Sequence, residues 1–255
     1  MSKISCVIIT YNESRNIRRC LESVSWADEM IVVDSKSEDG TASIAKEYTP
    51  KVFTQEWLGF ARQKEFACGL ASFEWILSID ADEVVTSELA REIRQKIDLY
   101  PEIDGYWIRR HSKFLCRWIA HAWQPDWVLR LFRKGEGFFE EKQVHEGVTL
   151  KGQTARLEGK IEHYPFENLS HNLKKLDHYS TLSASQLMGK RKGGILLKLF
   201  FSPILGFFKT YILKQGFRDG VPGLILSGLH SYYIFTKYAK CWELKNGKET
   251  QEVEE

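Results

Sequence analysis

Several features that would assign a protein to a class at once are missing from this chain of 255 residues. Its five cysteines are scattered, and no two form a Cys-x-x-Cys pair. This excludes the common zinc-binding and disulfide-framework patterns and is typical of reduced cytoplasmic thiols. No internal repeat or low-complexity linker is present, and 43% hydrophobic with 27% charged residues excludes a disordered or polytopic membrane protein. We therefore expect a globular protein with a substantial core.

Long hydrophobic runs are also missing. The N-terminal run at residues 4–9 is shorter than the apolar region of a signal peptide and is better interpreted as a buried first strand. Two apolar, uncharged segments of the C-terminal third, residues 199–208 and 220–236, have ten and 17 residues, whereas a membrane-spanning helix needs about 20. Pro203 and Pro222 interrupt them. The sequence therefore predicts no spanning helix.

Charge of one sign is not in excess overall, but it is unevenly distributed. The net charge is +2, yet residues 190–240 hold nine Lys or Arg and one acid, while residues 1–189 and 241–255 each sum to −3. The basic segment also holds ten of the 25 Phe and Tyr. This mixture is typical of helices in the interface of an anionic membrane, which we expect as a partner. Core packing or a dimer interface is the alternative interpretation. The uncharged apolar segments at residues 199–208 and 220–236 disfavour nucleic acid as the partner.

The first hundred residues alternate strand and helix patterns. Buried strands are predicted at residues 4–9, 30–33, 52–53 and 75–79. Helices are predicted at residues 14–24, 43–48, 60–71 and after Thr86, a predicted N-cap. The alternation favours an α/β fold, with a mostly parallel sheet and helices on both faces. Residues 105–165 show β patterns without a clear helix, which predicts an antiparallel extension, and residues 168–188 predict another helix.

Three carboxylates follow two of the predicted strands. Asp34 ends the second strand, and Asp80 and Asp82 follow the fourth in the segment SIDADE. Ligands of an open parallel sheet lie beyond the carboxyl ends of its strands. Two neighbouring carboxylates repel unless a cation joins them, and Mg²⁺ or Mn²⁺ takes oxygen ligands and bridges to phosphates. The pattern predicts a site for a divalent metal and a nucleoside diphosphate, with simple loop capping as the alternative interpretation.

Three segments, CVIITYNES, VVDSKSEDGT and SIDADE, resemble glycosyltransferase family 2, as does the linking GFARQKEFACGLASFEWIL. The chain resembles in particular the bacterial β-1,4-glucosyltransferases of the lipopolysaccharide core, and RLFR, VHEG and FRDGVPGL extend the resemblance over nearly the whole length. The resemblance implies a GT-A fold, a nucleotide-sugar donor such as UDP-glucose and inversion of the anomeric centre. It also implies a lipid-linked saccharide acceptor and a peripheral position on the cytoplasmic face of the inner membrane.

The resemblance also implies roles for single residues. The implied donor-binding residues are Thr10, Tyr11, Glu13, Asp34, Arg62, Lys64, Asp80 and Ala81. Asp82 would face the metal-bridged diphosphate, and His163 would complete the metal shell. Physical chemistry agrees, because Tyr11 offers a stacking face and Asp34 an acceptor for a base N–H. The chain departs from the family in two places: it has Arg62-Gln63-Lys64 where Arg-Asn is common, and it has one Asp, not two, at the end of the second strand. Arg62 and Lys64 either offset diphosphate charge or lie on a solvated helix face.

The catalytic base is expected after the antiparallel segment. An inverting transfer needs a carboxylate or His that removes the acceptor hydroxyl proton, while a metal stabilises the departing diphosphate. The candidates are Glu140, Glu141, His145 and Glu146. We choose Glu146, because it follows a short apolar alternation and precedes a glycine, whereas Glu140 and Glu141 lie in a charged loop. An ordinary loop acid is the alternative interpretation of Glu146.

The sequence predicts two domains. Residues 1–189 would form the GT-A domain, with residues 1–100 as its nucleotide-sugar half and 101–189 as its acceptor and catalytic half, and residues 190–255 would form a membrane-associating helical segment. Two other functions stay open. A nucleotidyltransferase shares strand-end carboxylates but needs a glycine-rich loop after the first strand, where this chain has YNESRN. A membrane adaptor with a degenerate sugar-nucleotide fold is the second alternative.

Overall fold

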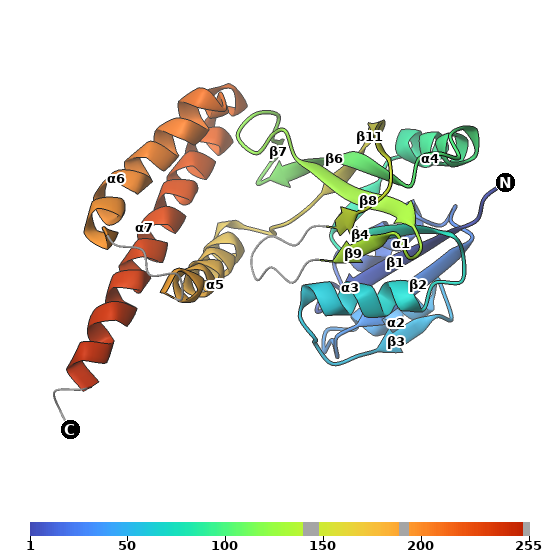
Figure 1. Ribbon diagram of the computed structural model, residues 1–255, viewed down its shortest axis with the longest axis horizontal. Coiled ribbons are helices and arrows are strands. Elements are labelled where there is room, and N and C mark those ends of the chain that lie inside the picture. The colour runs from blue at the N-terminus through green and yellow to red at the C-terminus, as the bar shows by residue number, and fades with distance from the viewer. Residues whose placement is uncertain (140–147, 189–193, 252–255) are drawn as a thin grey trace. The chain divides into compact units, whose positions relative to one another are not determined.

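The computed structural model describes residues 1–139, 148–188 and 194–251 (Figure 1). Two compact units are present, which we name the sheet unit (Met1–Ser112 with Asp126–Tyr164) and the helical unit (Lys113–Pro125 with Pro165–Glu255). These units are defined by packing. The functional division at residue 189 therefore stays a prediction.

The sheet unit begins with the predicted alternation of strands and helices. Four parallel strands pair in the order β3-β2-β1-β4: β1 (Ile4–Thr10), β2 (Glu29–Asp34), β3 (Val52–Thr54) and β4 (Trp75–Asp80). The helices between them are α1 (Ile17–Ser23), α2 (Thr41–Lys46) and α3 (Phe60–Gly69). After β5 (Glu83–Val85) comes α4 (Ser87–Leu99), whose N-cap Thr86 accepts a hydrogen bond from the Leu89 N–H, as predicted.

An antiparallel extension continues the sheet beyond β4, as predicted for residues 105–165. β8 (Trp127–Arg133) pairs antiparallel with both β4 and β6 (Gly105–Phe114). β11 (Thr154–His163) was not predicted; it pairs parallel with β6 and antiparallel with β5. Its register shifts between Arg156 and Lys160, so the two-residue periodicity that reveals a strand is broken around Gly159. β9 (Gly137–Phe139) and β10 (Val148–Leu150) pair separately.

The hydrophobic core lies on both faces of the parallel strands. Every residue of β1 is buried. Its Ile4, Cys6 and Ile8 belong to the cluster that contains α1 and α4 side chains, while Val7 and Ile9 belong to the cluster that contains α3 side chains. Successive side chains of a strand point to opposite faces. Burial on both faces is therefore why β1 reads as a continuous apolar run, and it confirms the predicted helices on both faces.

The helical unit is built from α5 (Leu169–Met188), α6 (Ile195–Phe208), the π-helical turn η1 (Lys209–Leu213), the 3₁₀ turn η2 (Gly216–Asp219) and α7 (Val221–Gln251). The two-residue strand β7 (Arg117–Trp118) also belongs to it. α7 packs against both α5 and α6. The core of this unit is formed by Phe114, Ile119, Ala122 and Leu226.

The structure corrects the predicted length of the apolar helices. α6 and η1 form one helix, Ile195–Leu213, of 19 residues and mean hydropathy 1.5. Within the described ranges this helix alone is long and apolar enough to cross a membrane, by length and composition only. The uncharged run at residues 199–208 ends at Lys198 and Lys209 and is interrupted by Pro203, but a long helix accommodates single lysines and an interior proline.

Candidate functional site

The carboxyl ends of β1, β2 and β4 bring predicted donor-binding residues to one edge of the sheet. Thr10 pairs with Asp34, and Ile9 pairs with Asp80, in the parallel register. Asp34 is buried, and its carboxylate accepts hydrogen bonds from the N–H (2.9 Å) and hydroxyl (2.6 Å) of Ser37. The parallel register thus places Asp34 and Asp80, 46 positions apart in the sequence, on either side of the end of β1.

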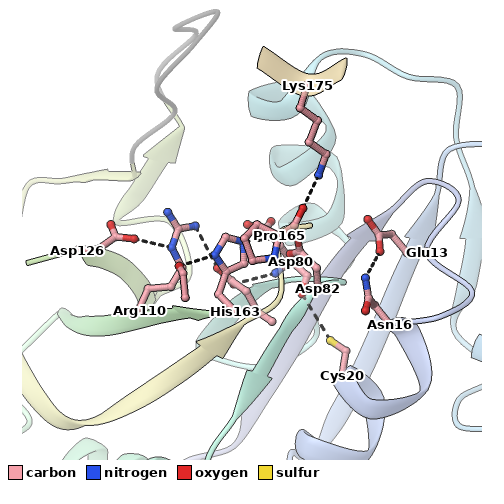
Figure 2. A network of polar contacts seen from close by, with 12 residues as sticks. Glu13, Asn16, Cys20, Asp80, Asp82, Arg110, Asp126, His163, Pro165 and Lys175 are labelled. Atoms are coloured by element: carbon pink, nitrogen blue, oxygen red, sulfur yellow. Dashed lines mark hydrogen bonds and ion pairs between the residues drawn. The ribbon is translucent and has the colours of Figure 1, made fainter. Parts of the chain in front are cut away.

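The residues that end and follow β1 offer groups that suit a nucleoside. Thr10 Oγ1 is buried and has no hydrogen-bond partner in the described parts of the chain. The Tyr11 side chain is 58% exposed, so its ring is available for stacking. Glu13 accepts a hydrogen bond of 2.5 Å from Asn16 Nδ2 (Figure 2). This arrangement can bind a base by stacking and a ribose by hydrogen bonds.

Asp80 lies between two cations. Lys64 Nζ is 2.8 Å from Asp80 Oδ1, and the Arg130 guanidinium pairs with Oδ2. Burial by itself raises the pKa of Asp80, but Arg130 and Lys64 hold the pKa well below its ordinary value, so the carboxylate is charged. Lys64 is buried and therefore does not lie on a solvated helix face, whereas Arg62 on the same helix is exposed.

Glu83 organises this turn, although no sequence motif distinguishes it from the neighbouring acids. The side chain is fully buried. Its Oε1 accepts hydrogen bonds from Arg130 Nη2 (2.7 Å) and Arg110 Nη1 (3.3 Å), and its Oε2 accepts one from the Asp80 N–H (3.0 Å). Arg110 also donates to Asp126 at 2.8 Å (Figure 2). The available signal in the sequence is an acid directly after the Asp80–Asp82 pair, with arginines at positions 110 and 130 inside the predicted antiparallel extension.

Asp82 and His163 lie together (Figure 2), at an Oδ2–Nε2 distance of 3.4 Å. His163 Nδ1 is 2.8 Å from the Ser112 hydroxyl, and this contact orients the ring so that Nε2 faces Asp82. A carboxylate oxygen and an imidazole nitrogen fit Mg²⁺ or Mn²⁺. Across the residues that the structure describes, no three His, Cys, Asp or Glu side chains gather at one point.

Two further predicted residues complete the account. Ala81 is buried between Asp80 and Asp82 and belongs to the hydrophobic core of the sheet unit. Glu146 lies outside the described residues, as do Glu140, Glu141 and His145. The assignment of the catalytic base therefore stays a prediction.

Comparisons with known proteins agree with the resemblance. The sequence model of Glycosyl transferase family 2 matches residues 5–149. The lipopolysaccharide core biosynthesis glycosyltransferase LpsC of Rhizobium meliloti is 31% identical over 252 residues, which cover 94% of this chain and 92% of that protein. An uncharacterized glycosyltransferase of Rickettsia typhi is also 31% identical, over 96% of this chain and 88% of its own.

A solved structure covers most of the chain as well. The crystal structure of S. aureus TarS in complex with UDP-GlcNAc is 15% identical, with a TM-score of 0.49, and the match covers 96% of this chain and 92% of that one. The matching family model and the two full-length relatives confirm the predicted family. The chain therefore belongs to glycosyltransferase family 2 and is a glycosyltransferase with the GT-A type of α/β fold.

Proposed function

We propose that this glycosyltransferase moves glucose from UDP-glucose to a lipid-linked saccharide of the lipopolysaccharide core, with inversion of the anomeric carbon. The observation that carries the proposal is the charged Lys64–Asp80–Arg130 network beside the Asp82–His163 pair at the carboxyl edge of the sheet. The similarity to LpsC over nearly its whole length supports the acceptor class.

The chain's own residues would bind and orient the donor. Tyr11 stacks on the uracil ring, and Asp34 accepts a hydrogen bond from its N–H. Lys64 offsets diphosphate charge from its place at Asp80. Asp82 and His163 are the residues that would hold a divalent metal, which would supply Lewis-acid stabilisation of the departing diphosphate.

Glu146 is the proposed base. It takes the proton of the acceptor hydroxyl while the hydroxyl oxygen attacks the anomeric carbon opposite the leaving group. The bond to the diphosphate oxygen breaks as the new glycosidic bond forms, so UDP departs with the electron pair and the carbon is inverted. The proton ends on the Glu146 carboxylate.

The test separates donor binding from transfer. Glu146→Gln should abolish glucose transfer, while UDP-glucose with Mn²⁺ should still raise the melting temperature. Glu158→Gln, which changes an exposed strand acid, is the matched control and should transfer at the normal rate. Normal transfer by Glu146→Gln would refute the assignment of the base. A wild-type chain that binds no nucleotide sugar would instead favour the membrane-adaptor alternative.

The cytoplasmic face of the inner membrane is the proposed location. A lipid-linked acceptor restricts the reaction to a membrane surface. The position is peripheral in this proposal, and the helical unit provides the attachment.

A further inference from the structure

An apolar stripe on α6 remains exposed to solvent. Six large apolar side chains, each at least 54% exposed, form two rows with a spacing of four residues: Leu197, Phe201 and Leu205 in one row, and Phe200, Ile204 and Phe208 in the other. Residues four apart lie on one side of a helix. We name these six residues the α6 stripe.

The opposite side of α6 packs against α7. Pro203, Gly206 and Thr210 are buried there, and the Ser231 hydroxyl donates a hydrogen bond of 2.9 Å to the Pro203 carbonyl. A Cβ atom on Gly206 would lie only 2.3 Å from Ile234 Cδ1, so the two helices approach closely. Because this packing fixes the rotation of α6, the α6 stripe faces away from α7.

Cations accompany the α6 stripe. Residues 195–218 contain Lys198, Lys209, Lys214 and Arg218 and no acid. All except Lys198 are exposed. A second copy that docked through the same stripe would bring these cations against their own equivalents, and like charges at an interface oppose association. Anionic lipid headgroups neutralise them instead, so the charge favours a lipid surface.

The neighbours of α6 favour a helix that lies flat over one that crosses the bilayer. α7 is tied to the polar helix α5 by Ser183 with Tyr233 (2.7 Å) and Lys240 with Asp177 (2.6 Å). Crossing would carry these groups into hydrocarbon, where polar and charged groups are costly. The 3₁₀ turn η2, which follows η1, is also held in place, because Asp219 accepts hydrogen bonds from the N–H groups of residues 120–122. Insertion of this turn into the bilayer would bury these polar groups in hydrocarbon.

We propose that the α6 stripe is a membrane-docking face that lies in the plane of an anionic bilayer surface. The six apolar side chains enter the acyl region, and the flanking cations contact lipid phosphates. The α6 stripe specifies which surface would hold the protein at the membrane. Only its role, which is to keep the enzyme near a lipid-linked acceptor, rests on the proposed function.

Flotation of the full chain with vesicles tests the proposal. The wild-type chain should bind vesicles that contain phosphatidylglycerol, and the binding should weaken with salt and on vesicles of phosphatidylcholine alone. Phe200→Gln with Leu205→Gln should lower the binding constant at least about tenfold, because two large apolar groups no longer enter the lipid. The matched control, Leu99→Gln with Leu244→Gln, changes exposed apolar residues elsewhere and should bind normally.

Three results would overturn the proposal. The first is equal vesicle binding by the stripe variant and the control. The second is retention of the wild-type chain in carbonate-washed membranes, which marks a spanning helix. The third is a wild-type dimer that becomes monomeric when the α6 stripe is substituted. Stabilisation by UDP-glucose with Mn²⁺ is measured on every variant and should not change. If UDP-glucose with Mn²⁺ does not stabilise the wild-type chain, the proposed donor is contradicted, but the flotation result is unaffected. The two proposals can therefore be refuted independently.

Discussion

Glu83→Gln is the sharpest test of the buried network that shapes the site. The substitution keeps the size of the side chain and removes its charge. In the wild type, the Glu83 carboxylate faces Arg130 at 2.7 Å and Arg110 at 3.3 Å, and it accepts the Asp80 N–H. In the variant, Arg130 keeps its ion pair with Asp80, and Arg110 keeps its ion pair with Asp126.

The expected loss of stability follows from burial. Removal of one partner from a buried ion pair costs about 3–5 kcal/mol when the remaining charge loses all compensation, whereas each arginine here keeps one carboxylate partner. Glu83 is fully buried, and the Arg130 side chain is only 8% exposed. Since the Gln carbonyl still accepts one hydrogen bond, we expect the lower end, about 3 kcal/mol, or roughly a hundredfold shift in the unfolding equilibrium.

Urea unfolding followed by circular dichroism measures the change. Glu47→Gln is the matched control, because it makes the same substitution in the exposed pair with Arg18 and should leave the midpoint unchanged. A second readout is the stabilisation by UDP-glucose with Mn²⁺, which should weaken in Glu83→Gln because the Asp80 turn is no longer held. Equal urea midpoints for the two variants would refute the reasoning.

Three further predictions concern pH, packing and metal. Burial raises the pKa of Glu29, but bonds led by Lys51 lower it from 4.5 to about 2, so the free energy of unfolding should fall as the pH drops from about 5 to about 2. Urea titrations should show a flatter profile for Glu29→Gln, and an unchanged profile would contradict this. Gly159→Ala should destabilise by about 1–3 kcal/mol, because its Cβ would lie 2.7 Å from the α4 backbone, whereas Gly228→Ala, with open space around it, should not lower the melting temperature. EDTA should remove the stabilisation by UDP-glucose, and Asp82→Asn should do the same with Mn²⁺ present; a normal shift in either case would exclude the proposed metal site.

Local patterns predicted most of the parallel half of the sheet. Strands buried on both faces read as short apolar runs, and the helices between them carry their own capping and spacing signals, as at Thr86. The acids at the ends of β2 and β4 were visible for the same reason, because they directly follow those runs. The pairing of Asp82 with His163 agrees with the resemblance, while the metal itself stays a proposal.

The remaining features depend on contacts between residues that are far apart in the sequence, so local patterns do not predict them. β11 carries a register shift, so its alternation is broken, and its neighbours β6 and β5 are remote in sequence. The role of Glu83 is not predicted by any local motif, since only the sheet brings Arg110 and Arg130 to it. The continuous helix through Pro203 is not predicted from uncharged runs, because Lys198 and Lys209 limit the run to residues 199–208 while the helix continues past both.

The sequence by itself determined the fold class, the family and the uneven distribution of charge, because these depend on local spacing and on short motifs. Only the tertiary structure decided which groups neutralise Asp80, which face of α6 is left exposed and how α7 fixes that face. The physical reason is that charge compensation and burial are properties of neighbours in space, and here those neighbours lie tens of residues apart in the chain.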